Sequence, residues 1–292
     1  MRAFALAVSL TLMPAAALAA TPQEIWKASL ADDNKGWATA PHAVLKIQDA
    51  AYIGEGNAAT LVGVKGKPQS YHWVAGRSAG VLTAHVQNGH PVVEKDGKTY
   101  DETALAKGIP VDTGVDVTGA QTQVQAGVIG ARIFVFNQQN PVAKAFKGVD
   151  YYPYDPAYVV SARFVPDPKL APHAFRTSRG TTKQFYHVGD ATFALAGKTV
   201  TLPFYADANV PAKIKAISAF FMDGLTGTET YGSGRYVDVE NFGAFPPKTI
   251  AIDFNYAYNP NCAHSHFFTC PIALDSIAAD VRAGERYTPG PH

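Results

Sequence analysis

Two polar strings in the C-terminal half of the sequence contain side chains that could bind a ligand or catalyse a reaction. They are TGTETYGSGRY (226–236) and DFNYAYNPNCA (253–263). If they form neighbouring strands, the alternation of side chains would gather carboxylates, an arginine and amides on one polar face. A glutamate near the C-terminus could join this face. The candidate ligand-binding residues are Glu229, Tyr231, Arg235, Asp253, Asn255, Asn259 and Glu285.

This polar face allows two interpretations. In the functional one, Arg235 holds an anionic ligand through two parallel hydrogen bonds, and a carboxylate with a raised pKa acts as acid or base. In the structural one, Arg235 pairs internally with Glu229 or Asp253, and Asn255 satisfies a turn. The sequence leaves both open, so it assigns no catalytic residue and does not decide whether the protein is an enzyme.

The two cysteines of the chain lie close together, with seven residues between Cys262 and Cys270. In an exported protein, such a pair predicts a disulfide bond. The same segment contains His264 and His266, so it also offers two thiolates and two imidazoles, a ligand set that suits zinc or copper. We expect the disulfide, and a metal site at these four residues is the alternative.

Other familiar catalytic motifs are missing from the sequence. It contains no H-E-x-x-H, no P-loop and no complete G-x-G-x-x-G, so no motif requires a cofactor. The tyrosine-rich runs YYPY (151–154) and YAY (256–258) could stack on sugars or other rings, although such residues more often form walls and core in β proteins.

One early segment is expected to form a helix. In TPQE (21–24), Thr21 is placed as N-cap, proline follows at the first helical position and Glu24 completes a capping box. Ile25, Trp26 and Leu30 then recur at helical spacing. We expect this short helix to end near Asp32 or Asp33 and to pack Trp26 on the body of the protein.

Almost everything after this helix is expected to consist of short strands and turns. Alternating residues predict strands, and 25 glycines and 20 prolines supply turns between them. The fold class is therefore mostly β, a β-sandwich or a barrel-like structure with a short N-terminal helix. The main predicted strands are 81–86, 131–136, 157–165, the hairpin 191–202, 213–222, 230–239 and 249–258.

The polar string NQQNP (137–141) indicates a boundary between two parts of the chain. We expect an N-terminal β-rich region at residues 21–140 and a C-terminal β domain at 141–292. A single continuous β domain is the alternative.

The first 20 residues have the features of a secretory signal peptide. Arg2 is followed by an apolar stretch and by the small residues of Ala17-Leu18-Ala19. We therefore expect an exported protein, periplasmic or secreted. The apolar stretch is too short for a transmembrane helix. A net charge of +1 without a basic cluster argues against nucleic-acid binding.

Several strings carry a resemblance to a known family. TGTETYGSGRY (226–236) and DFNYAYNPNCA (253–263) are followed by TCP (269–271) and AGE (283–285), and YYPYDP (151–156) precedes them. Over roughly residues 130–287 the chain resembles domain-of-unknown-function family 1684. The resemblance implies no activity.

Three functions are compatible with these residues. The first is an exported soluble protein that binds a small molecule or associates with the cell envelope. The second is an envelope hydrolase that uses the carboxylate and arginine cluster, or a metal-binding protein that uses the Cys/His loop. The third is a structural role without a pocket. The sequence does not indicate an oligomeric state.

Overall fold

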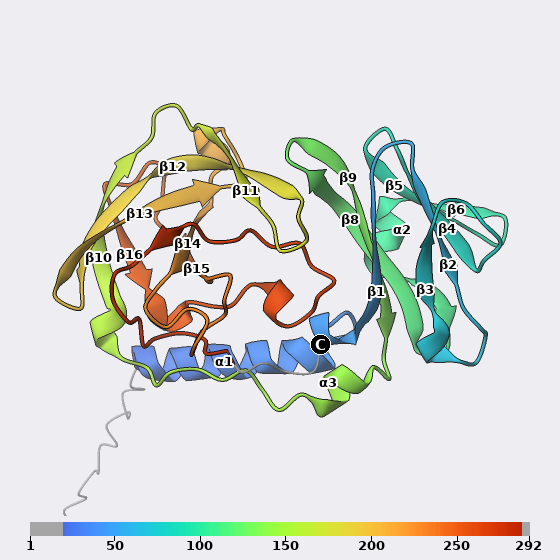
Figure 1. Cartoon of the computed structure of the whole chain (residues 1–292), viewed down its shortest axis with the longest axis horizontal. Coiled ribbons are helices and arrows are strands. Elements are labelled where there is room, and N and C mark those ends of the chain that lie inside the picture. The colour runs from blue at the N-terminus through green and yellow to red at the C-terminus, as the bar shows by residue number, and fades with distance from the viewer. Residues whose placement is uncertain (1–19, 288–292) are drawn as a thin grey trace, which may run out of the picture.

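The structure, a computed structural model, describes residues 20–287 and consists of two β bodies with one long helix beneath the second (Figure 1). The predicted mostly β fold is confirmed, with a barrel-like sheet in the C-terminal body. The predicted signal peptide, apart from Ala20, lies outside the described residues. No helix within residues 20–287 has the length and apolar character needed to cross a membrane.

The N-terminal body is a sandwich of two antiparallel sheets. Their strand orders are β1-β9-β8-β7 and β3-β2-β4-β5-β6. Apolar side chains from both sheets, such as Leu61, Val93 and Ile133, form one buried core. The strands are β1 (Ile47–Ile53), β2 (Ala58–Val62), β3 (His72–Ala75), β4 (Leu82–Gln87), β5 (His90–Lys95), β6 (Lys98–Tyr100), β7 (Ile109–Asp112), β8 (Val115–Gln125) and β9 (Val128–Asn137).

The C-terminal body is built on a single eight-stranded sheet with the main order β15-β14-β13-β12-β10-β16. The sheet curls until β15 meets the chain just after β16, where Tyr236 and Tyr258 exchange two backbone hydrogen bonds of 2.9 Å. The strands are β10 (Val159–Pro166), β11 (Pro172–Arg176), β12 (Thr182–Leu195), β13 (Lys198–Ala206), β14 (Ala216–Met222), β15 (Arg235–Glu240), β16 (Thr249–Asp253) and β17 (Asp275–Ser276).

Helix α1 (Pro22–Thr39) runs along the underside of the C-terminal body (Figure 1). Its predicted start is confirmed, because Thr21 and Glu24 form the capping box. The predicted end near Asp32 or Asp33 is wrong, since the helix continues to Thr39. Residues spaced three and four apart keep one face against the body, and this packing outweighs the weak helix propensity of Asn34 and Gly36.

The other helical segments are short. They are α2 (Glu102–Lys107), α3 (Pro141–Ala145) and the 3-10 turns η1 (Val44–Lys46), η2 (Pro68–Ser70), η3 (Pro156–Tyr158), η4 (Pro211–Lys213), η5 (Phe254–Tyr256) and η6 (Asn261–Ala263).

Two strands predicted around the polar strings are shorter than expected. Strand β15 begins at Arg235, because the preceding residues form turns in which Gly227 and Gly234 have positive φ angles. Strand β16 ends at Asp253, whose side chain caps η5. The regular alternation that would have gathered one polar face is therefore interrupted in both strings.

The two bodies contact each other through a small apolar cluster. Phe134 and Phe136 from β9 pack with Phe268 and Cys270 from the C-terminal loop. In addition, the Tyr52 hydroxyl donates to the Phe267 carbonyl oxygen at 2.9 Å. The strands up to Asn137 and those from Val159 lie in separate sheets, and the division into two domains near residue 140 stays a prediction.

Candidate functional site

Arg235, the arginine of the predicted polar face, lies inside the C-terminal body. Its side chain is 1% exposed and forms an ion pair of 2.6 Å with Asp223. The guanidinium also donates to the carbonyl oxygens of Val281, Ala283 and Glu285. Arg235 therefore fixes the C-terminal segment in place and has no open face for an anionic ligand. Arg235 does pair internally, but the predicted partners Glu229 and Asp253 are wrong, because the partner is Asp223.

Glu229 and Tyr231 lie apart from Arg235. The Glu229 carboxylate accepts hydrogen bonds from the Tyr152 hydroxyl and from Arg282 Nη1. The Tyr231 ring packs edge-on against Tyr287. Turns rather than a strand carry both residues, so neither shares a face with Arg235.

Asp253 and Asn255 brace the loop that follows β16. Asp253 accepts hydrogen bonds from the backbone N–H and the side-chain amide of Asn255. Asn255 in turn bonds both backbone groups of Asp155, while its own carbonyl oxygen accepts from Trp26 Nε1 at 2.9 Å. These contacts anchor helix α1 and the 151–156 segment to one loop.

Asn259 and Glu285 form a buried polar pair. Both residues are 1% exposed, and the Glu285 carboxylate accepts from the Asn259 backbone N–H at 2.8 Å and from its side-chain amide at 2.9 Å. His264 Nε2 lies 2.8 Å from the same carboxylate. The His264 ring packs on Trp37 of α1, with 4.2 Å between ring centroids. The pair thus connects the end of the C-terminal body to the helix.

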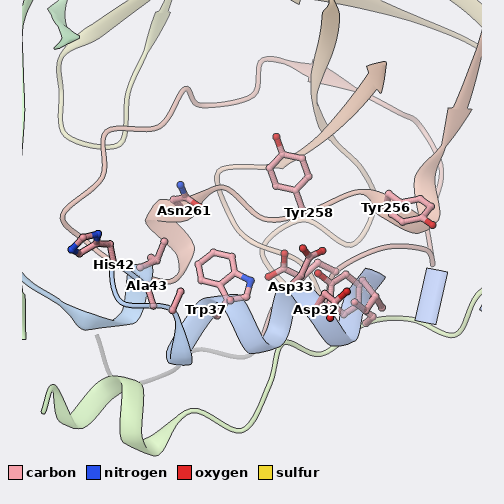
Figure 2. Close-up of a pocket in the computed structure, with 14 residues that line it drawn as sticks. Asp32, Asp33, Trp37, His42, Ala43, Tyr256, Tyr258 and Asn261 are labelled. Atoms are coloured by element: carbon pink, nitrogen blue, oxygen red, sulfur yellow. The ribbon is translucent and has the colours of Figure 1, made fainter. Parts of the chain in front are cut away.

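A cavity of about 430 Å³ lies between α1 and the loops of the C-terminal body. We call it the α1 cavity. Figure 2 shows Asp33 and Trp37 projecting from the helix toward the loop that carries Tyr256 and Tyr258. Of the seven predicted ligand-binding residues, Glu285 lines the cavity and Asn259 holds it there. The lining residues are Leu30, Asp32, Asp33, Gly36, Trp37, Ala40, His42, Ala43, Val44, Tyr151, Tyr256, Tyr258, Asn261 and Glu285.

Helical periodicity explains how α1 supplies one wall of the α1 cavity. Residues three or four apart share a helix face, and Leu30, Asp33, Trp37 and Ala40 follow this spacing from the buried anchor Trp26. The anchor fixes the rotation of the helix about its axis, so the same face presents an aspartate and a tryptophan to the cavity.

The α1 cavity carries more negative than positive charge. Asp32, Asp33 and Glu285 contribute carboxylates, and none of the described residues that line the cavity is lysine or arginine. Burial, and then repulsion from Asp32, raises the pKa of Asp33 above its ordinary value. Burial, followed by the charges of Glu285 and Asp33, holds the pKa of Tyr151 well above the usual tyrosine range.

The predicted disulfide is not formed, and both cysteines are free thiols. The 3-10 turn η6 places the backbone N–H of Cys262 3.2 Å from Cys270 Sγ, so the second sulfur accepts a hydrogen bond instead of bonding to the first. Hydrogen bonds from Cys270, then Ser178 and Tyr231, lower the pKa of Cys262 despite its burial. The hydrogen bond to Cys262 and burial raise the pKa of Cys270.

The alternative metal site is not assembled either. Within residues 20–287, no group of three or more His, Cys, Asp or Glu side chains is arranged to hold a metal ion. His264 turns toward Glu285, and the His266 ring packs on Phe267. The two imidazoles therefore do not join the two thiols of Cys262 and Cys270.

Comparison with protein families identifies the C-terminal part of the chain. The model of the family described as protein of unknown function (DUF1684) matches residues 144–286. Residues 144–286 belong to the DUF1684 family. The family resemblance read from the sequence motifs is thereby confirmed.

The solved structures that are similar to this chain include one of a protein described as uncharacterized. It is the solution NMR structure of the uncharacterized protein from gene locus rrnAC0354 of Haloarcula marismortui. The sequences are 29% identical, the match covers 50% of this chain and 80% of that chain, and the TM-score is 0.42. No curated protein gives a significant match.

The α1 cavity combines the DUF1684 region with residues that precede it. The DUF1684 region supplies Tyr151, Tyr256, Tyr258, Asn261 and Glu285, whereas the helix wall comes from outside the match. Motif reasoning within the family strings therefore could not find this wall. The signal that could have found it is the helical spacing that continues past Asp33 in the sequence.

Proposed function

We propose that this protein binds a small organic molecule in the α1 cavity. The observation that carries the proposal is the cavity itself, an open pocket of about 430 Å³ that is lined by aromatic side chains and a few polar groups. Natural small-molecule sites are concave spaces of roughly 300–1,000 Å³ with such a lining. The buried pair of Glu285 and Asn259 gives the cavity a fixed polar group at its edge.

We also place this binding outside the cytoplasm. The support is the signal-peptide pattern in the first 20 residues, which predicts export to the periplasm or the medium. The mass of the protein purified from an exported preparation tests this step, because cleavage after Ala19 or Ala20 removes the N-terminal segment. Retention of Met1 in the exported protein would contradict it.

The hydrolase hypothesis required carboxylates and Arg235 at an open site. The Arg235 guanidinium instead donates its hydrogen bonds to Asp223 and to backbone carbonyl oxygens inside the C-terminal body. Binding without catalysis is therefore the function that the arrangement supports best.

The test of ligand binding uses a variant that fills the cavity without straining the helix. Gly36 lines the cavity, and a Cβ built on it meets no atom within 4 Å. Gly36→Leu should therefore occupy cavity space, and Gly36→Ala serves as the matched variant with a minimal side chain. Both replacements also favour the helix.

We would measure binding of indole, phenol, glucose, acetate and tetramethylammonium by ligand-observed NMR. We expect at least one probe to bind the wild type and Gly36→Ala and to lose binding in Gly36→Leu, with no loss of thermal stability. Binding that survives Gly36→Leu, or the absence of binding for all five probes, would contradict the proposal.

A further inference from the structure

We propose that the ligand of the α1 cavity is a small alkylammonium cation, held against aromatic ring faces beside carboxylates that lack partners on the chain. This inference rests on the proposed function and specifies its ligand class. It is carried by the placement of charges and aromatic rings around one cavity.

Two carboxylates at the α1 cavity have no compensating group. Among residues 20–287, Asp32 and Asp33 are exposed and have neither an ion-pair nor a hydrogen-bond partner, and Asp33 lies close to the charge of Asp32. A ligand cation in the cavity would pair with these carboxylates without competing against a cation of the chain. The remaining carboxylate, Glu285, already accepts hydrogen bonds from Asn259 and lies beside His264.

The ionisable groups other than carboxylates do not reverse this balance. His42 lines the cavity, but its Nε2 lies 2.6 Å from the carboxylate of Asp116. The Tyr258 hydroxyl donates to Asp238 at 2.9 Å, which leaves the tyrosine ring as a wall. An anionic ligand would meet unpaired carboxylates without any lysine or arginine in the described lining.

Aromatic rings form much of the wall of the α1 cavity. Trp37, Tyr151, Tyr256 and Tyr258 all line the α1 cavity. The negative face of an aromatic ring attracts cations, tryptophan most strongly, and groups of rings recognise alkylated ammonium ions. Burial, together with nearby carboxylates, raises the pKa of Tyr151 and of Tyr256, so both rings are neutral phenols at physiological pH.

A bare metal ion fits this lining less well than an organic cation. No described group of His, Cys, Asp and Glu is arranged to hold a metal. The apolar residues Leu30, Ala43 and Val44 form part of the wall and would contact alkyl groups rather than a hydrated ion.

The experiment compares two probes of nearly identical shape. Choline carries a trimethylammonium group, and 3,3-dimethylbutan-1-ol carries an uncharged tert-butyl group in its place. With the purified full chain and titration calorimetry or NMR, we expect choline to bind about tenfold tighter than its neutral counterpart, the gain that cation–π and charge contacts imply.

Two aspartate variants assign the effect to the cavity. Asp33→Asn keeps the size of the side chain and should weaken choline binding about tenfold while leaving the neutral probe unchanged. The matched control is Asp207→Asn, an exposed aspartate that does not line the cavity. This control should bind both probes like the wild type.

The outcomes separate this inference from the proposed function. Equal affinity for choline and its neutral counterpart, with both lost in Gly36→Leu, would overturn the cation inference and leave small-molecule binding in place. The same conclusion follows if neither binds but indole or phenol does so in a Gly36→Leu-sensitive manner. If no probe binds at all, both proposals fail.

Discussion

Arg235 and Asp223 form an ion pair inside the C-terminal body, with 2.6 Å between Arg235 Nη2 and Asp223 Oδ2. Their side chains are 1% and 0% exposed. The arginine also bonds three backbone carbonyls of the 281–285 segment, which ends at a residue of the α1 cavity. Arg235 thus stabilises the fold of the C-terminal body, and it affects the α1 cavity only by holding the 281–285 segment in place.

Removal of this arginine should unfold the protein at a much lower denaturant concentration. Arg235→Ala leaves the Asp223 carboxylate buried without its partner, a change that costs about 3–5 kcal/mol in comparable buried pairs. We expect a correspondingly large fall in the free energy of unfolding, measured by urea denaturation followed by circular dichroism.

The control for Arg235→Ala is Arg282→Ala. Arg282 pairs with Glu229 at the surface, where its side chain is 50% exposed, so its removal should change the free energy of unfolding by less than about 1 kcal/mol. Similar stability losses in the two variants would contradict the structural role of the buried pair.

Local patterns account for the parts of the fold that the sequence predicted correctly. The capping box of Thr21 and Glu24 starts α1 through contacts three residues apart, and alternating apolar residues indicate strands through a repeat of two. The predicted end of α1 was wrong. The contact of Trp37 with His264 in the distant C-terminal loop extends the helix beyond the weak helix formers Asn34 and Gly36.

The cavity was beyond prediction for a related reason. Its walls join α1 to tyrosines more than a hundred residues away, and no local pattern states that pairing. The predicted strand at 230–239 also misplaced the polar residues. Turns at Gly227 and Gly234 interrupt the alternation of side chains before Arg235. Only Glu285 and its partner Asn259 connect the predicted set to the cavity.

Glu285 should prove necessary for stability as well as for the shape of the cavity. In Glu285→Gln, one carboxylate oxygen becomes an amide donor that faces the N–H groups of Asn259. A buried unsatisfied donor costs about 1–3 kcal/mol. We expect a loss of this size in urea unfolding, whereas Glu240→Gln, at an exposed position on β15, should leave stability unchanged. Equal stability of the two variants would show that the buried pair is dispensable.

The two free thiols should differ in reactivity. Hydrogen bonds from Cys270, Ser178 and Tyr231 lower the pKa of Cys262, whereas the hydrogen bond to Cys262 and burial raise that of Cys270. The thiolate is the reactive species. Iodoacetamide should therefore modify Cys262 first, with a rate midpoint below the pH of about 8.5 that is typical of a free cysteine.

Peptide mapping of the alkylated protein at several pH values checks this order. Cys262→Ser should remove the fast phase, and Cys270→Ala should raise the pH midpoint of Cys262, because alanine cannot donate the hydrogen bond that contributes most to lowering its pKa. Faster labelling of Cys270 in the native protein would be incompatible with the arrangement of the pair.

Gly36→Ala should stabilise the protein. Gly36 lies within α1, its φ angle is not positive, and an added Cβ meets no atom within 4 Å. Alanine is favoured over glycine in a helix interior by about 1 kcal/mol. We expect a rise of up to that amount in the free energy of unfolding. A fall instead would mean that the helix is not continuous through this residue.

Choline binding should weaken on acidification. Burial and then Asp32 raise the pKa of Asp33, so Asp33 takes up a proton at a higher pH than an ordinary aspartate and loses its attraction for a cation. The affinity for choline is therefore highest above the raised pKa of Asp33, and it falls as the pH decreases through that pKa. Titration calorimetry of choline at a series of pH values measures this decline.

Other ionisable groups around the α1 cavity must be separated from Asp33 in this experiment. They include His42, which lies next to Asp116, and His264, which lies next to Glu285. The raised pKa values of Tyr151 and Tyr256 keep both phenols neutral throughout. Asp33→Asn retains all these groups, so the difference between its pH profile and that of the wild type isolates Asp33. Parallel profiles would show that Asp33 does not contact the cation, whereas a decline confined to the wild type would place the ligand's charge at this carboxylate.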